Sequence, residues 1–313
     1  MQPFAIAGMQ LELPAAGDNI ARMGQRLDHV MALYPWVQMV MFSELAAFGP
    51  LPATATELPG PAEERFQAMA KKHSVWLLPG TMFERVGDEV FNTASVINPE
   101  GEVIGRYRKQ FPFLPYEEGV SSGDSFLVFD VPDVGRFGVS ICYDMWFPET
   151  TRTLVSMGAE VILHPTMTTT IDREIELSIA RANAAMNQCF FIDVNGAGDS
   201  GIGRSILVGP YGDIIHQAGR IEELIPVEID LDRVRRSREF GLRGLGQPLK
   251  SFRDRKVKFE LYGPGGEDGS ALHRLGPLVV PERGTRAGLR RRPAQAPVEP
   301  TSDPALGGPG EVV

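Results

Sequence analysis

Short apolar runs recur along the first 262 residues and are bounded by Gly, Pro, Asn or Asp. Each run has the length of a β-strand, and several are apolar throughout, which is typical of strands buried on both faces. We expect strands at 4–9, 37–42, 75–80, 93–98, 126–131, 138–142, 159–165, 189–195, 205–209 and 224–231.

Helical periodicity separates some of these runs. A helix is expected at 18–34, with Asp18 as its N-cap, because its apolar positions share one face; they are Ile20, Met23, Leu27, Val30 and Met31. Further helices are expected at 61–73, 148–158 and 172–188, and the segment 89–109 reads as a hairpin that turns at "PEG". Strands that alternate with helices predict an α/β fold with a mixed sheet.

The composition changes near residue 262, after which the chain is rich in Gly, Pro and Arg and loses its periodicity. Such a segment buries too little apolar surface to offset the entropy of ordering it. We therefore expect one folded domain at 1–262 and a mostly disordered tail at 263–313.

Composition narrows the class of protein. The chain is 43% hydrophobic and 23% charged, with a net charge of −9, which argues against a nucleic-acid partner. Two cysteines make no disulfide framework, and neither a signal peptide nor a membrane span is recognisable, so we expect a cytoplasmic protein. We find no HExxH motif and no zinc-type Cys/His spacing, and we expect no metal and no cofactor.

Three polar residues directly follow apolar runs: Glu44, Lys109 and Cys142. Ligands of α/β proteins bind at the carboxyl ends of strands, so these side chains are candidates for one site. Each also has an ordinary interpretation when taken alone: a solvated glutamate, a surface lysine among arginines, and a packed thiol. For Cys189 the packed thiol is the interpretation we adopt.

Taken together, the three residue types suit acyl transfer. A carboxylate can take the proton of a thiol and later deliver it to a leaving amine, as Glu44 would for Cys142. An ammonium such as that of Lys109 can stabilise the oxyanion of a tetrahedral intermediate. This chemistry needs no histidine; His164 could line a pocket, but nothing marks it as a base.

The segments that carry these residues resemble motifs of the nitrilase, or carbon–nitrogen hydrolase, superfamily. They are "FSEL" with Glu44, "GRYRKQFPF" with Lys109 and "GVSICYDMWFPE" with Cys142, in the family's order. The resemblance extends over about 4–260 and includes "GAEVILHPT" and "ARANAAMNQCFFIDVNGAG". Ser43 stands where many relatives carry proline, which leaves the acid in place.

The resemblance implies a four-layer αββα sandwich and assembly into a homodimer or higher homo-oligomer. It also implies a second glutamate that holds the lysine. We assign this role to Glu118, because its distance to Gly123 resembles the pattern E-G-x-x-x-G of amidase members. The alternative is that Glu117 and Glu118 are two surface acids. The backbone N–H of Tyr143 would be the second oxyanion donor.

Tyr143 and Asp144 after the cysteine resemble the amidase and carbamoylase branches. We expect hydrolysis of a small carboxamide through a thioester, with release of ammonia and a carboxylic acid. Residues expected to contact the substrate are Phe113, Tyr143, Trp146, His164 and Thr166. The alternatives are a carbamoyl substrate clamped by Arg173 or Arg204, a nitrile, acyl transfer to an amine, and a non-catalytic binding module.

Overall fold

The computed structural model describes residues 3–263, 272 and 278–279. The chain separates into a unit of Met1–Leu275 and a second unit, Gly276–Val313, of which only two residues are described. The expected tail at 263–313 therefore lies almost entirely outside the described residues.

The first of two β-sheets has seven strands. They are β1 (Phe4–Gln10), β2 (Met39–Phe42), β3 (Trp76–Leu78), β4 (Met82–Val86), β5 (Glu89–Ile97), β6 (Val103–Arg108) and β13 (Glu223–Ile229). The order is β13-β1-β2-β3-β5-β4, and β6 pairs with β5. The central pairs β1–β2 and β2–β3 are parallel and the others antiparallel, so the sheet is mixed, as predicted.

The second sheet has six strands in the order β12-β11-β10-β9-β8-β7. They are β7 (Leu127–Val131), β8 (Gly135–Val139), β9 (Val161–Thr166), β10 (Phe190–Asn195), β11 (Ile206–Val208) and β12 (Ile214–Gln217). The strand predicted at 138–142 is wrong at its end: β8 stops at Val139, and Cys142 begins a 3₁₀ turn, Cys142–Trp146.

The helices are α1 (Ile20–Leu33), α2 (Pro61–His73), α3 (Pro148–Ser156), α4 (Arg173–Asn187), α5 (Asp232–Phe240) and α6 (Pro248–Arg253). Short 3₁₀ turns lie at Pro52–Thr54, Gly198–Ser200 and Glu260–Tyr262. The predicted N-cap is off by one residue, because Asn19 precedes α1 and the Asp18 carboxylate accepts the Ile20 N–H. Within the described residues, no helix has the length and hydropathy needed to cross a bilayer.

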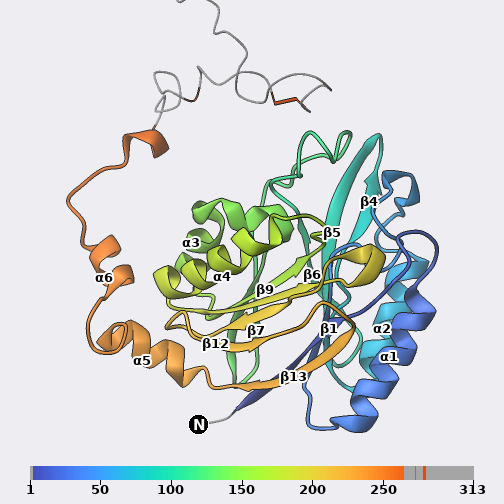
Figure 1. Cartoon of the computed structure of the whole chain (residues 1–313), viewed down its shortest axis with the longest axis horizontal. Helices are drawn as coiled ribbons and strands as arrows, with labels where there is room; N and C mark the ends of the chain where they lie inside the picture. Colours follow the sequence, from blue (N-terminus) through green and yellow to red (C-terminus); the bar gives the residue numbers. More distant parts are fainter. Residues whose placement is uncertain (1–2, 264–271, 273–277, 280–313) are drawn as a thin grey trace, which may run out of the picture. The chain divides into compact units, whose positions relative to one another are not determined.

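Both faces of the central strands are buried, which explains their continuous apolar sequences. Successive side chains of a strand point to opposite faces. In β1, Ile6 lies in the core between the sheets, whereas Ala7 packs beneath α1 and α2. In β10, Ile192 lies in the inter-sheet core and Phe191 beneath α3 and α4. The outcome is the predicted αββα sandwich, with α1 and α2 on one side of the sheets and α3 and α4 on the other (Figure 1).

Candidate active site

Glu44, Lys109 and Cys142 come together where strands of the two sheets end. Glu44 follows β2, Lys109 directly follows β6, and Cys142 comes three residues after β8. The Lys109 Nζ donates to Glu44 Oε1 over 3.0 Å, and the Cys142 thiol lies within hydrogen-bonding reach of the Glu44 carboxylate. Both charged side chains are withdrawn from water, with Glu44 2% and Lys109 1% exposed. The thiol, the carboxylate and the ammonium thus form one continuous set.

A tight turn presents Cys142. Its φ of 45° is in the left-handed region, which costs a non-glycine residue conformational energy and persists only where the surrounding structure holds it. The buried carboxylate of Asp144 holds the turn, because its Oδ2 accepts the Ile141 N–H at 2.9 Å and the Tyr107 hydroxyl at 2.7 Å. The other oxygen accepts the Phe111 N–H at 2.9 Å, so one side chain ties the cysteine turn to the loop after Lys109.

The second carboxylate on Lys109 belongs to Glu117. Its Oε2 accepts the Lys109 Nζ at 2.7 Å and also the Phe113 N–H. The expectation that Glu118 holds Lys109 is therefore wrong. The backbone turn from Phe113 to Glu117 directs the Glu117 side chain inward, and the next residue, Glu118, is exposed.

Asn92 is a contributor that the sequence analysis missed. This buried residue of β5 donates from Nδ2 to Glu44 Oε1 over 2.8 Å and to Glu117 Oε1 over 3.4 Å. Its backbone carbonyl accepts the Lys109 N–H. The sequence does contain a signal for this role. Asn92 is a polar residue within a mostly apolar strand, and that strand pairs with the one before Lys109.

Burial and neighbouring charges set the protonation of the three groups. Burial raises the pKa of Glu44, and the nearby Lys109 opposes that rise. Burial alone would lower the pKa of Lys109, but the carboxylate of Glu44, then Cys142 and Glu117, hold it well above its usual value. Burial and the Glu44 charge raise the pKa of Cys142 well above that of a free thiol. The resting site therefore holds a neutral thiol beside a carboxylate with increased proton affinity and a firmly charged lysine.

Three of the expected substrate contacts are aromatic and lie in one cluster. The ring of Tyr143 meets that of Phe113 edge-on, with centroids 5.0 Å apart, and lies 6.1 Å from that of Trp146. All three residues are partly buried. Tyr143 and Trp146 belong to the 3₁₀ turn that begins at Cys142, and Phe113 packs on Tyr143.

The two expected contacts in β9 differ from each other. Thr166 lies at the nucleophile, because its carbonyl accepts the Glu44 N–H and its hydroxyl is within hydrogen-bonding reach of the Cys142 thiol. His164 is fully buried, and its Nδ1 lies 2.8 Å from the Ser140 hydroxyl. Burial and the charges of Arg173 and Lys109 lower the pKa of His164 to about 3, so the ring is neutral.

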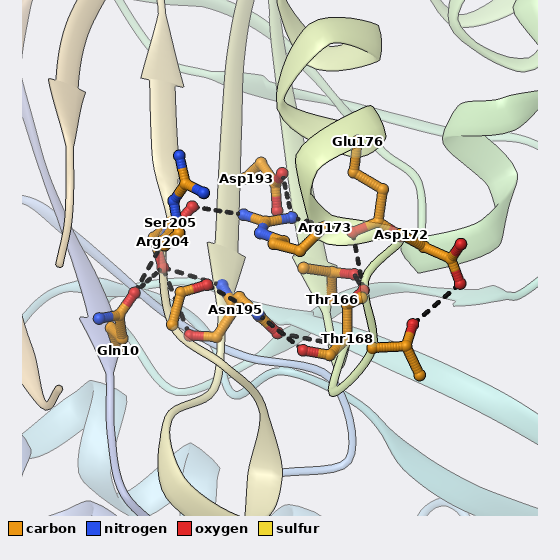
Figure 2. Close-up of polar contacts among 12 residues, drawn as sticks. Gln10, Thr166, Thr168, Asp172, Arg173, Glu176, Asp193, Asn195, Arg204 and Ser205 are labelled. Atoms are coloured by element: carbon orange, nitrogen blue, oxygen red, sulfur yellow. Dashed lines mark hydrogen bonds and ion pairs between the residues drawn. The ribbon is translucent and has the colours of Figure 1, made fainter. Parts of the chain in front are cut away.

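Neither arginine considered for a carboxylate clamp is unpaired. Arg173 is fully buried between the carboxylates of Glu176 and Asp193, so the expectation that it could face a substrate is wrong (Figure 2). Arg204 forms an ion pair with Glu174. Across the residues that are described, no group of three or more His, Cys, Asp or Glu side chains is arranged to hold a metal ion.

Both the sequence and the fold have counterparts among known proteins. The family model for carbon–nitrogen hydrolases matches residues 5–239. The omega-amidase NIT2-A of Xenopus laevis is 31% identical over 260 residues, 76% of this chain and 93% of the relative. The human omega-amidase NIT2 is 30% identical over 204 residues, 60% of this chain and 73% of the relative. The crystal structure of Saccharomyces cerevisiae Nit3, a member of branch 10 of the nitrilase superfamily, superposes with a TM-score of 0.70 at 26% identity, covering 76% of this chain and 94% of that chain.

Proposed function

The chain belongs to the carbon–nitrogen hydrolase family, and we propose that it hydrolyses a small carboxamide with Cys142 as the nucleophile. In this proposal Glu44 is the general base and acid, Lys109 and the Tyr143 N–H stabilise the oxyanion, and Glu117 positions Lys109. One observation carries the assignment: the buried carboxylate of Glu44 accepts a hydrogen bond from the Lys109 ammonium over 3.0 Å and lies within hydrogen-bonding reach of the Cys142 thiol.

The first half of the reaction forms a thioester. The Cys142 sulfur attacks the amide carbonyl carbon as its proton passes to Glu44, whose raised pKa makes it a better acceptor than an ordinary carboxylate. The carbonyl oxygen becomes an oxyanion between the Lys109 ammonium and the Tyr143 N–H. Glu44 then gives its proton to the nitrogen, the C–N bond breaks, and ammonia leaves.

The second half consumes water. Glu44, again ionised, takes a proton from a water molecule as the water oxygen attacks the thioester carbon. The same two donors hold the second oxyanion. Collapse of this intermediate breaks the C–S bond, the proton on Glu44 returns to sulfur, and the carboxylic acid leaves. Because Lys109 stays charged through both halves, it acts as an electrostatic group and not as a proton donor.

An amide suits this set of groups better than a nitrile. An amide already has the oxygen that the two donors receive, whereas a nitrile gives a thioimidate that must be protonated at nitrogen and then hydrated. Several relatives, including the omega-amidases of frog and human, carry amidase names. We extend that reaction class to this chain.

The acyl group is proposed to be apolar or aromatic. Phe113, Tyr143 and Trp146 offer ring surface beside the nucleophile. A carbamoyl amino acid would need a cation for its carboxylate, and the two arginines considered for that role are already paired with acids of the chain.

A matched pair of substrates tests the reaction: an aromatic nitrile and its own carboxamide, at equal concentration. We expect ammonia and free acid from the carboxamide and little from the nitrile. The Cys142→Ala variant should fold and release no ammonia, and wild type incubated with a slow amide should carry an acyl group on the Cys142 peptide. Turnover in Cys142→Ala would remove the nucleophile from the proposal; faster release from the nitrile would change the reaction class alone.

A further inference from the structure

A buried ion cluster lies beside the nucleophile, at the start of α4. The Arg173 Nη1 donates to Glu176 Oε2 over 3.2 Å and to Asp193 Oδ2 over 2.9 Å, and Nη2 donates to the Arg204 carbonyl over 2.8 Å. Figure 2 shows the guanidinium between the two carboxylates. Glu176 and Asp193 are 3% and 0% exposed, so two buried acids share one cation. Burial raises the pKa of Asp193 to about 6. The positive charge of Arg173 opposes this rise, and the negative charge of Glu176 adds to it.

Two threonines connect this cluster to Cys142. Thr168 Oγ1 donates to Glu176 Oε2 over 2.8 Å. An ionised carboxylate can only accept, so the single hydroxyl proton of Thr168 is engaged and its oxygen can only accept in turn. The Thr166 hydroxyl lies 3.4 Å from that oxygen and within hydrogen-bonding reach of the Cys142 thiol, whose pKa it lowers.

The Thr166 hydroxyl therefore has one proton and two possible acceptors. When Cys142 is a thiol, Thr166 can donate to the Thr168 oxygen. When Cys142 is a thiolate, the sulfur requires that proton, and Thr166 must give up its bond to Thr168. The negative charge of Glu176 opposes a second negative charge nearby. The hydrogen-bond chain and the charge of Glu176 thus both favour the thiol form of Cys142 over the thiolate.

We propose that Glu176 is a positioning residue that keeps Cys142 in its thiol form until a substrate is bound. It acts through Thr168 and Thr166 and through its own charge, and the proposal rests on the proposed function in taking Cys142 as the nucleophile. The charged groups that face the sulfur are Glu44 after β2, Lys109 after β6 and Glu176 in α4, while His164 in β9 is neutral.

The electrostatics of the thiol agree with this role. Burial is the main cause that raises the pKa of Cys142; the charges of Glu44 and Glu176 raise it further, and Lys109 and the Thr166 hydroxyl oppose them. A thiol reacts far more slowly than a thiolate with oxidants and alkylating agents. The resting enzyme is thereby protected, and the sulfur loses its proton only to Glu44 as the bond to the substrate carbon forms.

Alkylation by iodoacetamide measures this property without any amide substrate. The rate of carbamidomethylation of the Cys142 peptide is followed by mass spectrometry as a function of pH, and Cys189 is read on a separate peptide. Glu176→Gln keeps an acceptor oxygen for Thr168 and Arg173 and removes the charge. We expect the midpoint of the profile to move to lower pH by about one unit, which makes alkylation near neutral pH about tenfold faster.

Two threonine variants separate the hydrogen bond from the charge. Thr168→Val removes the competing acceptor and leaves the Glu176 charge, so the midpoint should move to lower pH by less than in Glu176→Gln. Thr166→Val removes the donor to the thiolate and should move the midpoint to higher pH, while Thr166→Ser should restore it. A merely structural role for these residues would not give shifts of opposite sign.

A midpoint in Glu176→Gln that is unchanged, or higher than in wild type, would overturn the proposal. If Glu176→Gln does not fold, Thr168→Val alone tests the proposal, because this variant leaves the ion pairs of Arg173 with Glu176 and Asp193 in place. An unchanged or higher midpoint in Thr168→Val would then overturn the proposal. Failure of the proposed function is a separate result: it appears as amide turnover by Cys142→Ala, which the alkylation profile does not measure.

Discussion

Lys109 is held by the carboxylates of Glu44 and Glu117. Substitutions of Glu117 and of its neighbour Glu118 test whether the second carboxylate is needed for catalysis. In Glu117→Gln the lysine keeps a neutral hydrogen-bond partner but loses a charged one, and its ammonium is no longer fixed against the oxyanion. A loss of kcat of about 10² is expected, similar to the loss of one oxyanion donor. Initial rates of ammonia release at saturating amide give the measurement.

The neighbouring glutamate is the control for that experiment. Glu118 has the same charge and is exposed to solvent, so Glu118→Gln should stay within about twofold of wild type, as surface changes generally do. The assignment of Glu117 would be wrong if the two variants lost activity equally, or if Glu118→Gln lost more.

At the residue scale, the sequence predicts the groups that lie at strand ends better than those in loops. Glu44, Lys109 and Cys142 each follow an apolar run, and the end of a buried strand limits where a side chain can lie. The choice between Glu117 and Glu118 depends on one turn, which the Phe113 backbone and the Lys109 ammonium determine together. No local pattern contains that information.

At the scale of elements, the connection between β3 and β4 supports the Glu44 segment. Gly80 has a φ of 75°, and a Cβ built on it would lie 1.8 Å from the Ser43 carbonyl oxygen. One residue on, the Thr81 hydroxyl accepts the Leu45 N–H at 2.9 Å. The residues on both sides of Glu44 are therefore fixed by this short connection, and the direction of the carboxylate follows from it.

Gly80→Ala should consequently damage both stability and catalysis. The left-handed φ alone costs an alanine about 1–2 kcal/mol, and the clash with Ser43 should add about 1–3 kcal/mol as the backbone shifts. Urea unfolding measures the stability, and kcat reports the displacement of Glu44.

Gly87 offers a matched control, since its φ is 59° and a Cβ there would meet nothing within 4 Å. Gly87→Ala should lose only the conformational part of the stability and keep its activity. Equal losses in the two variants would mean that the contact between Gly80 and Ser43 is unimportant.

Segments whose apolar residues follow one clear period were predicted well, whereas segments in which charged residues interrupt the apolar pattern were not. The helix expected at 18–34 is present as α1, and the hairpin around "PEG" is present as β5 and β6. The strand β4 was missed because its charged residues, Glu84 and Arg85, interrupt the apolar pattern. Arg108 from β6 pairs with Glu84, so a contact distant in sequence makes up for what the local sequence lacks.

At the scale of the whole molecule, the buried members of the three main apolar cores, as far as the structure describes the chain, all lie between Phe4 and Val234. Truncation after Tyr262 should therefore leave a body that melts cooperatively, within a few degrees of the full chain. Circular dichroism at increasing temperature checks this, and sedimentation of both forms tests the expected homodimer. Insolubility or a broad melt of the shorter chain would mean that residues 263–313 contribute to the core.

The pairing of β1 with β13 bears on how the protein is made. Phe4 lies opposite Ile229 and Gln10 opposite Glu223, so nearly the whole body of the chain separates the two partners. On a ribosome, β1 is made before the other strands that the structure describes and must wait for the last of them, β13, before that edge of the sheet closes. During this interval its backbone N–H and C=O groups on that side lack their final partner and can attract other strands. The newly made chain is thus most prone to aggregate before translation reaches the codons of β13.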